Sequence, residues 1–125
     1  IIELQEYRLS DNPSQAEIKQ GLDKEAELIL TKIPKSTWFC VLTPEGKMLS
    51  SEQLAEKLAE VKLSGRSSAC FLIGSSFGIA EQIKKQADFK LSMSPMTFPH
   101  HLARIMALEQ IYRAESIQAG SKYHK

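Results

Sequence analysis

The apolar and polar positions divide the chain into helical and extended segments that alternate along its length. From Ile18 to Ile33, apolar residues recur at intervals of three and four, a spacing that predicts an amphipathic helix. Ser14 and Glu17 form a capping box at its start, and Pro34 ends it. The first third of the chain therefore contains one well-delimited helix.

Three more helices are predicted downstream. Ser50 and Gln53 form a second capping box ahead of an apolar spacing that Gly65 ends. A short helix is expected over Ala80–Ala87. The longest helical pattern covers Pro99–Ser116, and the fixed φ of its proline suits a first helical turn.

Extended segments lie between these helices. The apolar, β-rich runs Thr37–Leu42 and Ser67–Ile73 are typical of strands buried on both faces. A short strand is expected at Phe89–Ser92, and the alternation over Ile1–Arg8 predicts another. Strands that alternate with helices indicate an α/β fold with a parallel sheet, in a single domain over residues 1–125.

In parallel sheets, ligands bind beyond the carboxyl ends of the strands. Three predicted loops leave such ends, and we expect them to share a ligand site: Leu42–Gly46, with a turn over Thr43–Gly46, then Gly74–Gly78 and Met93–Pro99. The two glycines of the second loop suit either a nucleotide held against backbone N–H groups or a tight turn. The third loop is apolar, with two prolines, and suits either a slot for a purine or thioether or a closure of the core.

The long helix carries two charges on its apolar side. Leu102, Ile105, Met106 and Tyr112 mark one face by their spacing, and Glu109 and Arg113 fall among them. Acid precedes base by four residues, so the two side chains can pair. Such a pair has two interpretations, an ion pair at a helix or subunit interface and a functional site.

The composition removes several classes of function. With 42% hydrophobic residues, 25% charged residues and a net charge of +1, the chain has the profile of a soluble domain without a generally basic surface. No apolar run approaches the roughly 20 residues of a membrane span, and no signal peptide is visible. Cys40 and Cys70 lie in apolar runs without metal-ligand spacing, which predicts buried reduced thiols and no metal site. A serine hydrolase lacks its nucleophile motif here.

Four motifs together resemble a known family. They cover the chain in the right order and spacing: Leu72–Gly74, Met96–His100, Glu109–Ala114 and Tyr123–Lys125. The chain is similar in these to the bacterial ribosomal RNA large subunit methyltransferase H family, which belongs to the SPOUT superfamily of knotted methyltransferases.

The resemblance implies a cytoplasmic homodimer with a C-terminal trefoil knot, which uses S-adenosylmethionine and needs no metal. The implied activity is methylation of N3 of a pseudouridine in large-subunit ribosomal RNA within the ribosome. The implied cofactor-binding residues are Leu42, Thr43, Gly74, Ser75, Ser94, Pro95, Met96, Thr97, Phe98 and Pro99. They fall in the three loops already expected to share a ligand site.

Catalytic roles are expected for Tyr123 and His124, with the tail supplied by the partner subunit, and for Arg113. RNA contacts are expected from Arg104, His100 and Lys125. The rival hypothesis is a catalytically silent RNA- or ribosome-binding dimer of the same fold.

Two departures from the family motivate that rival. The strand and helix with which members open are expected to be lacking before Ile1, and Ser75 replaces a glycine that the family usually has. The hydroxymethyl group of Ser75 is expected to crowd the cofactor. A generic nucleotide-binding α/β domain is a third hypothesis.

Overall fold

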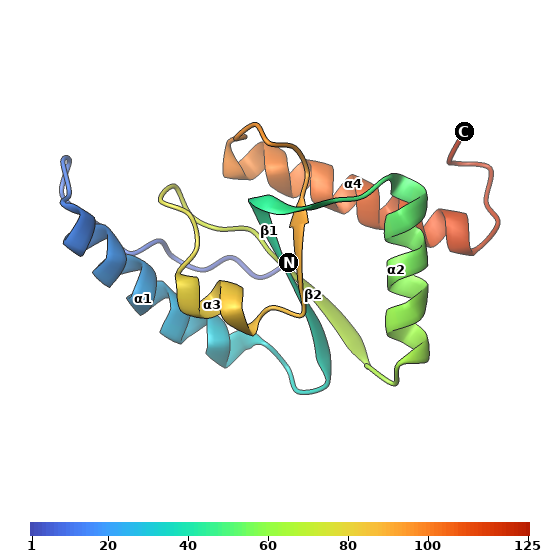
Figure 1. The fold of residues 1–125 in the computed structure, drawn as a ribbon, viewed down its shortest axis with the longest axis horizontal. Helices are drawn as coiled ribbons and strands as arrows, with labels where there is room; N and C mark the ends of the chain where they lie inside the picture. Colours follow the sequence, from blue (N-terminus) through green and yellow to red (C-terminus); the bar gives the residue numbers. More distant parts are fainter.

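The computed structural model describes residues 1–125 as a three-stranded parallel sheet covered by four helices (Figure 1). The strand order is β2-β1-β3, so β1 is central. The α/β fold with a parallel sheet is thus confirmed, and the knot stays a prediction. The elements are α1 (Gln15–Lys32), β1 (Thr37–Met48), α2 (Ser51–Leu63), β2 (Ser68–Leu72), α3 (Glu81–Gln86), β3 (Phe89–Ser92) and α4 (His100–Gln118).

Helices cover both faces of the sheet, with α1 and α3 on one side and α2 and α4 on the other (Figure 1). Alternate residues of β1 serve the two layers. Trp38 and Cys40 pack with α2 and α4, whereas Phe39 and Val41 pack with α1 and α3. The uninterrupted apolar run of β1 therefore reflects burial on both faces, as predicted.

The capping signals are confirmed at both predicted helix starts. Ser14 accepts a hydrogen bond from the Glu17 backbone N–H, and Ser50 does the same for Gln53, with the reciprocal bonds also formed. Each box satisfies two N–H groups that have no partner within the helix.

The turn predicted over Thr43–Gly46 is wrong, because β1 continues to Met48. Leu42 and Lys47 both pair with Leu91 of β3, so the four residues between them bulge out of the ladder. A Cβ on Gly46 would lie 2.7 Å from the backbone C and O atoms of Lys90. The missing side chain lets the chain return against β3.

The strand predicted over Ile1–Arg8 is also wrong. These residues pair with no strand, and the Tyr7 N–H donates to the Glu25 carboxylate of α1 instead. Apolar and polar side chains do alternate along this segment, but it does not lie beside any strand of the sheet. Its beginning is open to solvent, with Ile1 and Ile2 exposed.

The prediction that β2 is buried on both faces is only partly right. β2 is an edge strand, and its first residues, Ser68 and Ala69, are exposed, whereas Cys70–Leu72 are half-buried. The continuous apolar run could not distinguish a central strand from one with a free edge.

Helix α4 points its small residues inward and its large ones outward. Ala107, Ala114 and Ser116 are buried, whereas Ile105 and Tyr112 are 62% and 59% exposed. The face predicted from the spacing exists, but within one chain it stays largely exposed, with Tyr123 of the chain end packed against Tyr112. None of the four helices has the length and hydrophobicity needed to cross a membrane.

Candidate functional site

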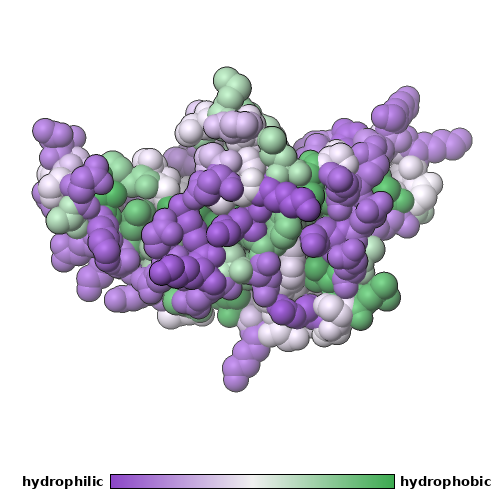
Figure 2. Space-filling view, in the orientation of Figure 1, coloured by the Kyte–Doolittle hydropathy of each residue, from purple (hydrophilic) through white to green (hydrophobic).

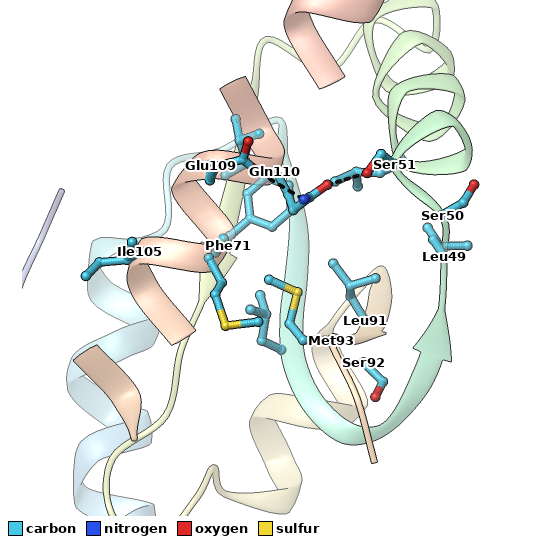
Figure 3. Close-up of a pocket in the computed structure, with 15 residues that line it drawn as sticks. Leu49, Ser50, Ser51, Phe71, Leu91, Ser92, Met93, Ile105, Glu109 and Gln110 are labelled. Carbon is cyan, nitrogen blue, oxygen red and sulfur yellow. Dashed lines mark hydrogen bonds between the residues drawn. The ribbon is translucent and has the colours of Figure 1, made fainter. Parts of the chain in front are cut away.

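A cavity of about 480 Å³ lies where the carboxyl ends of β1 and β3 meet α2 and α4. Leu42, Ser92 and Met93 contribute from the strand ends, and Glu109 borders it from α4. Figure 3 shows Phe71 and Met93 pointing into this cavity. Ten of its fifteen lining residues are hydrophobic, so its walls are apolar and its polar groups are few.

Hydrogen bonds between polar side chains at the edge of this cavity join α2 and α4. The Ser51 hydroxyl at the start of α2 donates to the Gln110 side-chain oxygen of α4 at 2.7 Å, and the Gln110 amide donates to Glu109 at 2.9 Å (Figure 3). Glu109 is thereby fixed at the cavity rim, where it also belongs to the cluster of C-terminal residues described below.

A second cavity, of about 370 Å³, lies between α1, the end of β2 and the first half of α4. Gly74 and Ser75 line it, as do His100, His101 and Arg104. The two cavities share the wall residues Phe71, Ala107 and Ile111, so they lie on either side of the contact between β2 and α4.

The Gly74–Gly78 loop closes on itself as a tight turn. Ser75 and Gly78 exchange backbone hydrogen bonds of 3.2 and 3.0 Å, and the Ser76 N–H donates to Glu6. These N–H groups are therefore already engaged, which favours the tight-turn interpretation over a phosphate cradle. The Ser75 hydroxyl donates to Glu25 of α1 at 3.1 Å.

The apolar loop after β3 lies outside both cavities except for its first residue, Met93, which lines the first cavity. The Ser92 hydroxyl donates to the Ser94 carbonyl, and the Ser94 hydroxyl accepts from the Met96 N–H. Met96 in this loop is 71% exposed. Figure 2 shows a mainly hydrophilic face with smaller hydrophobic areas. The structure therefore brings only some predicted cofactor residues to a cavity: Leu42 to the first, Gly74 and Ser75 to the second, and none of Ser94, Pro95, Met96, Thr97, Phe98 and Pro99 to either.

Thr43 also lies outside both cavities. It is buried at the start of the bulge, where its hydroxyl helps to lower the pKa of Glu45. The larger cause is the Lys84 ammonium of α3, which donates to Glu45 at 2.6 Å and holds the pKa of that carboxyl at about 2. The ion pair fastens the bulge to α3.

The chain end folds back on α4 and forms a cluster of charged and polar side chains. The Arg113 guanidinium donates from Nη2 to Glu109 Oε1 at 2.6 Å, so the ion pair predicted from the spacing is confirmed. The Tyr123 hydroxyl donates to the same carboxylate oxygen at 3.0 Å. His124 Nδ1 lies 3.1 Å from Arg113 Nη1, and its Nε2 lies 2.7 Å from Glu52 Oε1 of α2. We call Glu52, Glu109, Arg113, Tyr123 and His124 the tail cluster.

Hydrogen bonds in the tail cluster shift the pKa values of its two carboxyl groups and of its phenol. The hydrogen bond from Arg113 lowers the pKa of Glu109, and the one from His124 lowers the pKa of Glu52. The bond to Glu109 raises the pKa of Tyr123, so its phenol remains a donor near pH 7. In this arrangement the Tyr123 hydroxyl holds the tail against α4.

The residues expected to bind RNA lie apart from one another. Arg104 forms an ion pair with Glu3, and the His100 and His101 rings are 4.2 Å apart at the start of α4. Lys125 is exposed at the other end of the molecule, beyond the tail cluster. These residues do not form one patch within the single chain.

Comparison with known proteins identifies the family. A model described as predicted SPOUT methyltransferase matches residues 1–124. The chain belongs to the SPOUT methyltransferase family.

Named relatives agree with this assignment. The chain is 44% identical over all of its 125 residues to a protein of Clostridioides difficile (strain 630), and 46% identical to one of Alkaliphilus oremlandii (strain OhILAs). Both proteins are named "Ribosomal RNA large subunit methyltransferase H", and the chain covers 79% of each. This SPOUT methyltransferase is therefore an enzyme, as its sequence motifs predicted.

Sequence reasoning missed Glu52, the one residue of the tail cluster that comes from α2. No spacing rule could have found it, because it lies 72 residues from its partner His124. Nor was Glu25 expected near Ser75. In this SPOUT methyltransferase no three His, Cys, Asp or Glu side chains are grouped so that they could hold a metal ion.

Proposed function

We propose that the protein transfers a methyl group from S-adenosylmethionine to N3 of a pseudouridine in large-subunit ribosomal RNA. The observation that carries the proposal is the position of the first cavity, which opens at the strand ends and shares Glu109 with the tail cluster. The name shared by the two relatives supports the ribosomal substrate. A reaction on ribosomes would take place in the cytoplasm.

The first cavity suits the cofactor in size and chemistry. Its volume lies within the range of about 300–1,000 Å³ that is typical of small-molecule sites. Leu42, Met93 and Phe71 offer apolar contact for a purine and a thioether chain, and Ser50 and Ser51 offer hydroxyls for an amino-acid end. The second cavity, beside Gly74 and Ser75, is the alternative location that the predicted cofactor residues allow.

Most of the rate must come from positioning, because methyl transfer requires an in-line approach of the nitrogen to the methyl carbon. When bound, S-adenosylmethionine supplies an electrophilic methyl group on a sulfonium. A bond forms between N3 and the methyl carbon, the bond from that carbon to sulfur breaks, and the N3 proton is released to water. The fixed Arg113 guanidinium stabilises the negative charge that develops on the uracil ring. Tyr123 and His124 keep Arg113 and the tail in place.

RNA contacts are assigned to both ends of α4 in this proposal. Arg104 and His100 serve phosphates at its start, and Lys125 serves one beyond the tail. Because the three lie apart within one chain, a substrate that contacts all of them must be large or must span two chains, as ribosomal RNA bound to a dimer would.

A homodimer follows from the outward face of α4. Leu102, Ile105, Leu108 and Tyr112 are each more than 40% exposed, and a row of such side chains on one helix is costly in water. Covering it with the same face of a second copy would give a two-fold interface. Glu109 and Arg113 lie beside these residues on α4, so the tail cluster and the first cavity of each subunit would lie near this seam.

The deciding experiment uses ribosomes from a strain that lacks the enzyme. They are incubated with the protein and S-adenosylmethionine, and the ribosomal RNA nucleosides are analysed by mass spectrometry. We expect a nucleoside heavier than pseudouridine by one methyl group, with the added mass on the base. Without cofactor it should not form. Unmodified pseudouridine after full incubation would contradict the proposal.

The catalytically silent dimer is the competing outcome, and a thermal shift separates it. A ligand that binds the native state raises the melting temperature by mass action. We expect S-adenosylmethionine and its demethylated product each to raise it, and ATP or NAD not to. A chain that binds ribosomes yet shows no shift with either cofactor form would be the silent protein.

A further inference from the structure

Helix α4 ends in a turn that aims the tail at α2. Gly120 has φ = +71°, and its N–H bonds back to Ile117 while the Ser121 N–H bonds back to Ser116. This pair of bonds is the Schellman arrangement, which reverses the chain after the helix. The reversal brings His124 between α4 and the first turn of α2, where Glu52 lies.

The partners of His124 fix which ring nitrogen carries the proton. Arg113 can only donate, so His124 Nδ1 must accept across the 3.1 Å contact with Arg113 Nη1. A neutral ring that accepts at Nδ1 carries its proton on Nε2. Nε2 lies 2.7 Å from Glu52 Oε1, so this proton points at the carboxylate. The hydrogen bond from His124 also lowers the pKa of Glu52, which favours the ionised form that can only accept.

We propose that Glu52 is a positioning residue, which fixes His124 as the Nε2–H tautomer and, through it, fixes the guanidinium of Arg113. The proposal rests on the function proposed above, in which Arg113 stabilises the charge on the methylated base. Glu52 itself touches neither Glu109 nor Arg113 and acts only through the imidazole.

Arg113 is held from two sides as a result. Its Nε and Nη2 groups donate to Glu109, and Nη1 donates to His124. Three of the five N–H groups of the guanidinium are used in these bonds, which leaves two for a substrate. If His124 lost its tautomer, Nδ1–H would face Arg113, donor against donor, and the guanidinium would move away from it.

Glu52 is suited to a test because its removal should leave the fold intact. Its side chain is 60% exposed, and exposed ion pairs contribute little to stability. Glu52→Ala removes the acceptor. Glu52→Gln keeps an oxygen that can accept from Nε2–H and serves as the conservative variant. Glu56→Ala is the matched control, because Glu56 is an exposed carboxylate one turn further along α2.

The direct measurement is the nitrogen NMR spectrum of the histidine rings in the full chain, with His124→Ala used to assign the signals among the three histidines. We expect wild type, Glu52→Gln and Glu56→Ala to show protonated Nε2 and bare Nδ1 at His124, and Glu52→Ala to show averaged signals of both tautomers. Equal His124 signals in wild type and Glu52→Ala would overturn the proposal.

The second measurement is the rate of methylation of ribosomes taken from a strain that lacks the enzyme. Loss of a charge-assisted hydrogen bond predicts a fall in kcat of roughly tenfold or more for Glu52→Ala, with KM for S-adenosylmethionine unchanged and Glu52→Gln in between. An unchanged kcat in Glu52→Ala would overturn the positioning role. If wild type itself methylates nothing, the proposed function fails, and the NMR spectra still decide whether Glu52 sets His124.

Discussion

The Tyr123 hydroxyl donates a hydrogen bond to Glu109 Oε1 across 3.0 Å, which ties the end of the chain to the middle of α4. The same oxygen accepts from Arg113 Nη2. The Tyr123 ring also lies 4.8 Å from both the Arg113 guanidinium and the Tyr112 ring. One carboxylate at the rim of the first cavity therefore organises the tail and the guanidinium together.

This shared acceptor predicts unequal losses from two substitutions. Tyr123→Phe keeps the ring contacts and removes one donor, so we expect kcat for ribosome methylation to fall about two- to fivefold. Glu109→Gln removes the charge that holds both Arg113 and the tail, so a fall of about tenfold or more is expected. Initial rates at saturating cofactor measure both. A larger loss in Tyr123→Phe would mean that the hydroxyl acts on the substrate directly.

The outward face of α4 predicts that one charge will separate the subunits. Ile105→Glu places a carboxylate at the centre of the exposed apolar row and should convert a dimer to a monomer in sedimentation equilibrium. Lys85→Glu is the control and should remain dimeric, because Lys85 is an exposed residue of α3, on the opposite face of the sheet from α4. Wild type that sediments as a monomer would contradict the homodimer.

Gly46 predicts a cost in stability at the β1 bulge. In Gly46→Ala the new Cβ would lie 2.7 Å from the Lys90 backbone, so β1 and β3 must separate locally. We expect the free energy of unfolding in urea to fall by about 1–3 kcal/mol. Lys47→Ala, at the exposed neighbouring position, should change it by no more than about 0.5 kcal/mol. Equal values for the two variants would show that the bulge adapts freely.

How far the fold could be predicted depended on whether a signal was local. The capping boxes at Ser14 and Ser50 involve residues three apart, and both were right. The strand at Ile1–Arg8 and the turn at Thr43–Gly46 were wrong, because pairing depends on distant partners that a short pattern does not contain. An alternating segment can be extended without lying in a sheet.

The site divides in the same way. The Glu109–Arg113 pair follows from a four-residue spacing and was predicted. The apolar face of α4 was also predicted, but the spacing of its residues could not tell whether this face packs into the core or is exposed on the surface of the chain. The contact of Glu52 with His124 depends on the turn at Gly120 and on the packing of α2 beside α4, so only the structure reveals it.

The ion pair between Glu45 and Lys84 predicts a pH dependence of stability. Hydrogen bonds from Lys84, which is the largest cause, and from Thr43 lower the pKa of Glu45 from 4.5 to about 2 in the folded chain. A depressed folded pKa means that the pair stabilises the fold above about pH 4.5, and that this contribution disappears as the pH falls toward 2. Since Glu45 is 56% exposed, the contribution at pH 7 should be below about 1 kcal/mol.

Urea unfolding of Lys84→Met at pH 7, 4 and 2.5 measures this contribution. The difference from wild type should be present at pH 7 and become smaller at each lower pH. Lys85→Met, which removes an exposed lysine next in sequence, should show no such trend. A difference that stays constant from pH 7 to 2.5 would assign the effect of Lys84 to the packing of its methylenes.

Two cavities contain predicted cofactor residues, and filling each in turn decides between them. Leu42→Trp places an indole in the first cavity. Leu28→Trp places one in the second cavity, which the half-exposed Leu28 lines from α1. At a hundredfold excess over its dissociation constant, S-adenosylmethionine should stabilise wild type by about 2.7 kcal/mol. We expect Leu42→Trp to lose the corresponding rise in melting temperature and Leu28→Trp to keep it. The reverse result would move the cofactor to the second cavity, beside Gly74, and would separate the methyl donor from the tail cluster by the wall of Phe71 and Ala107.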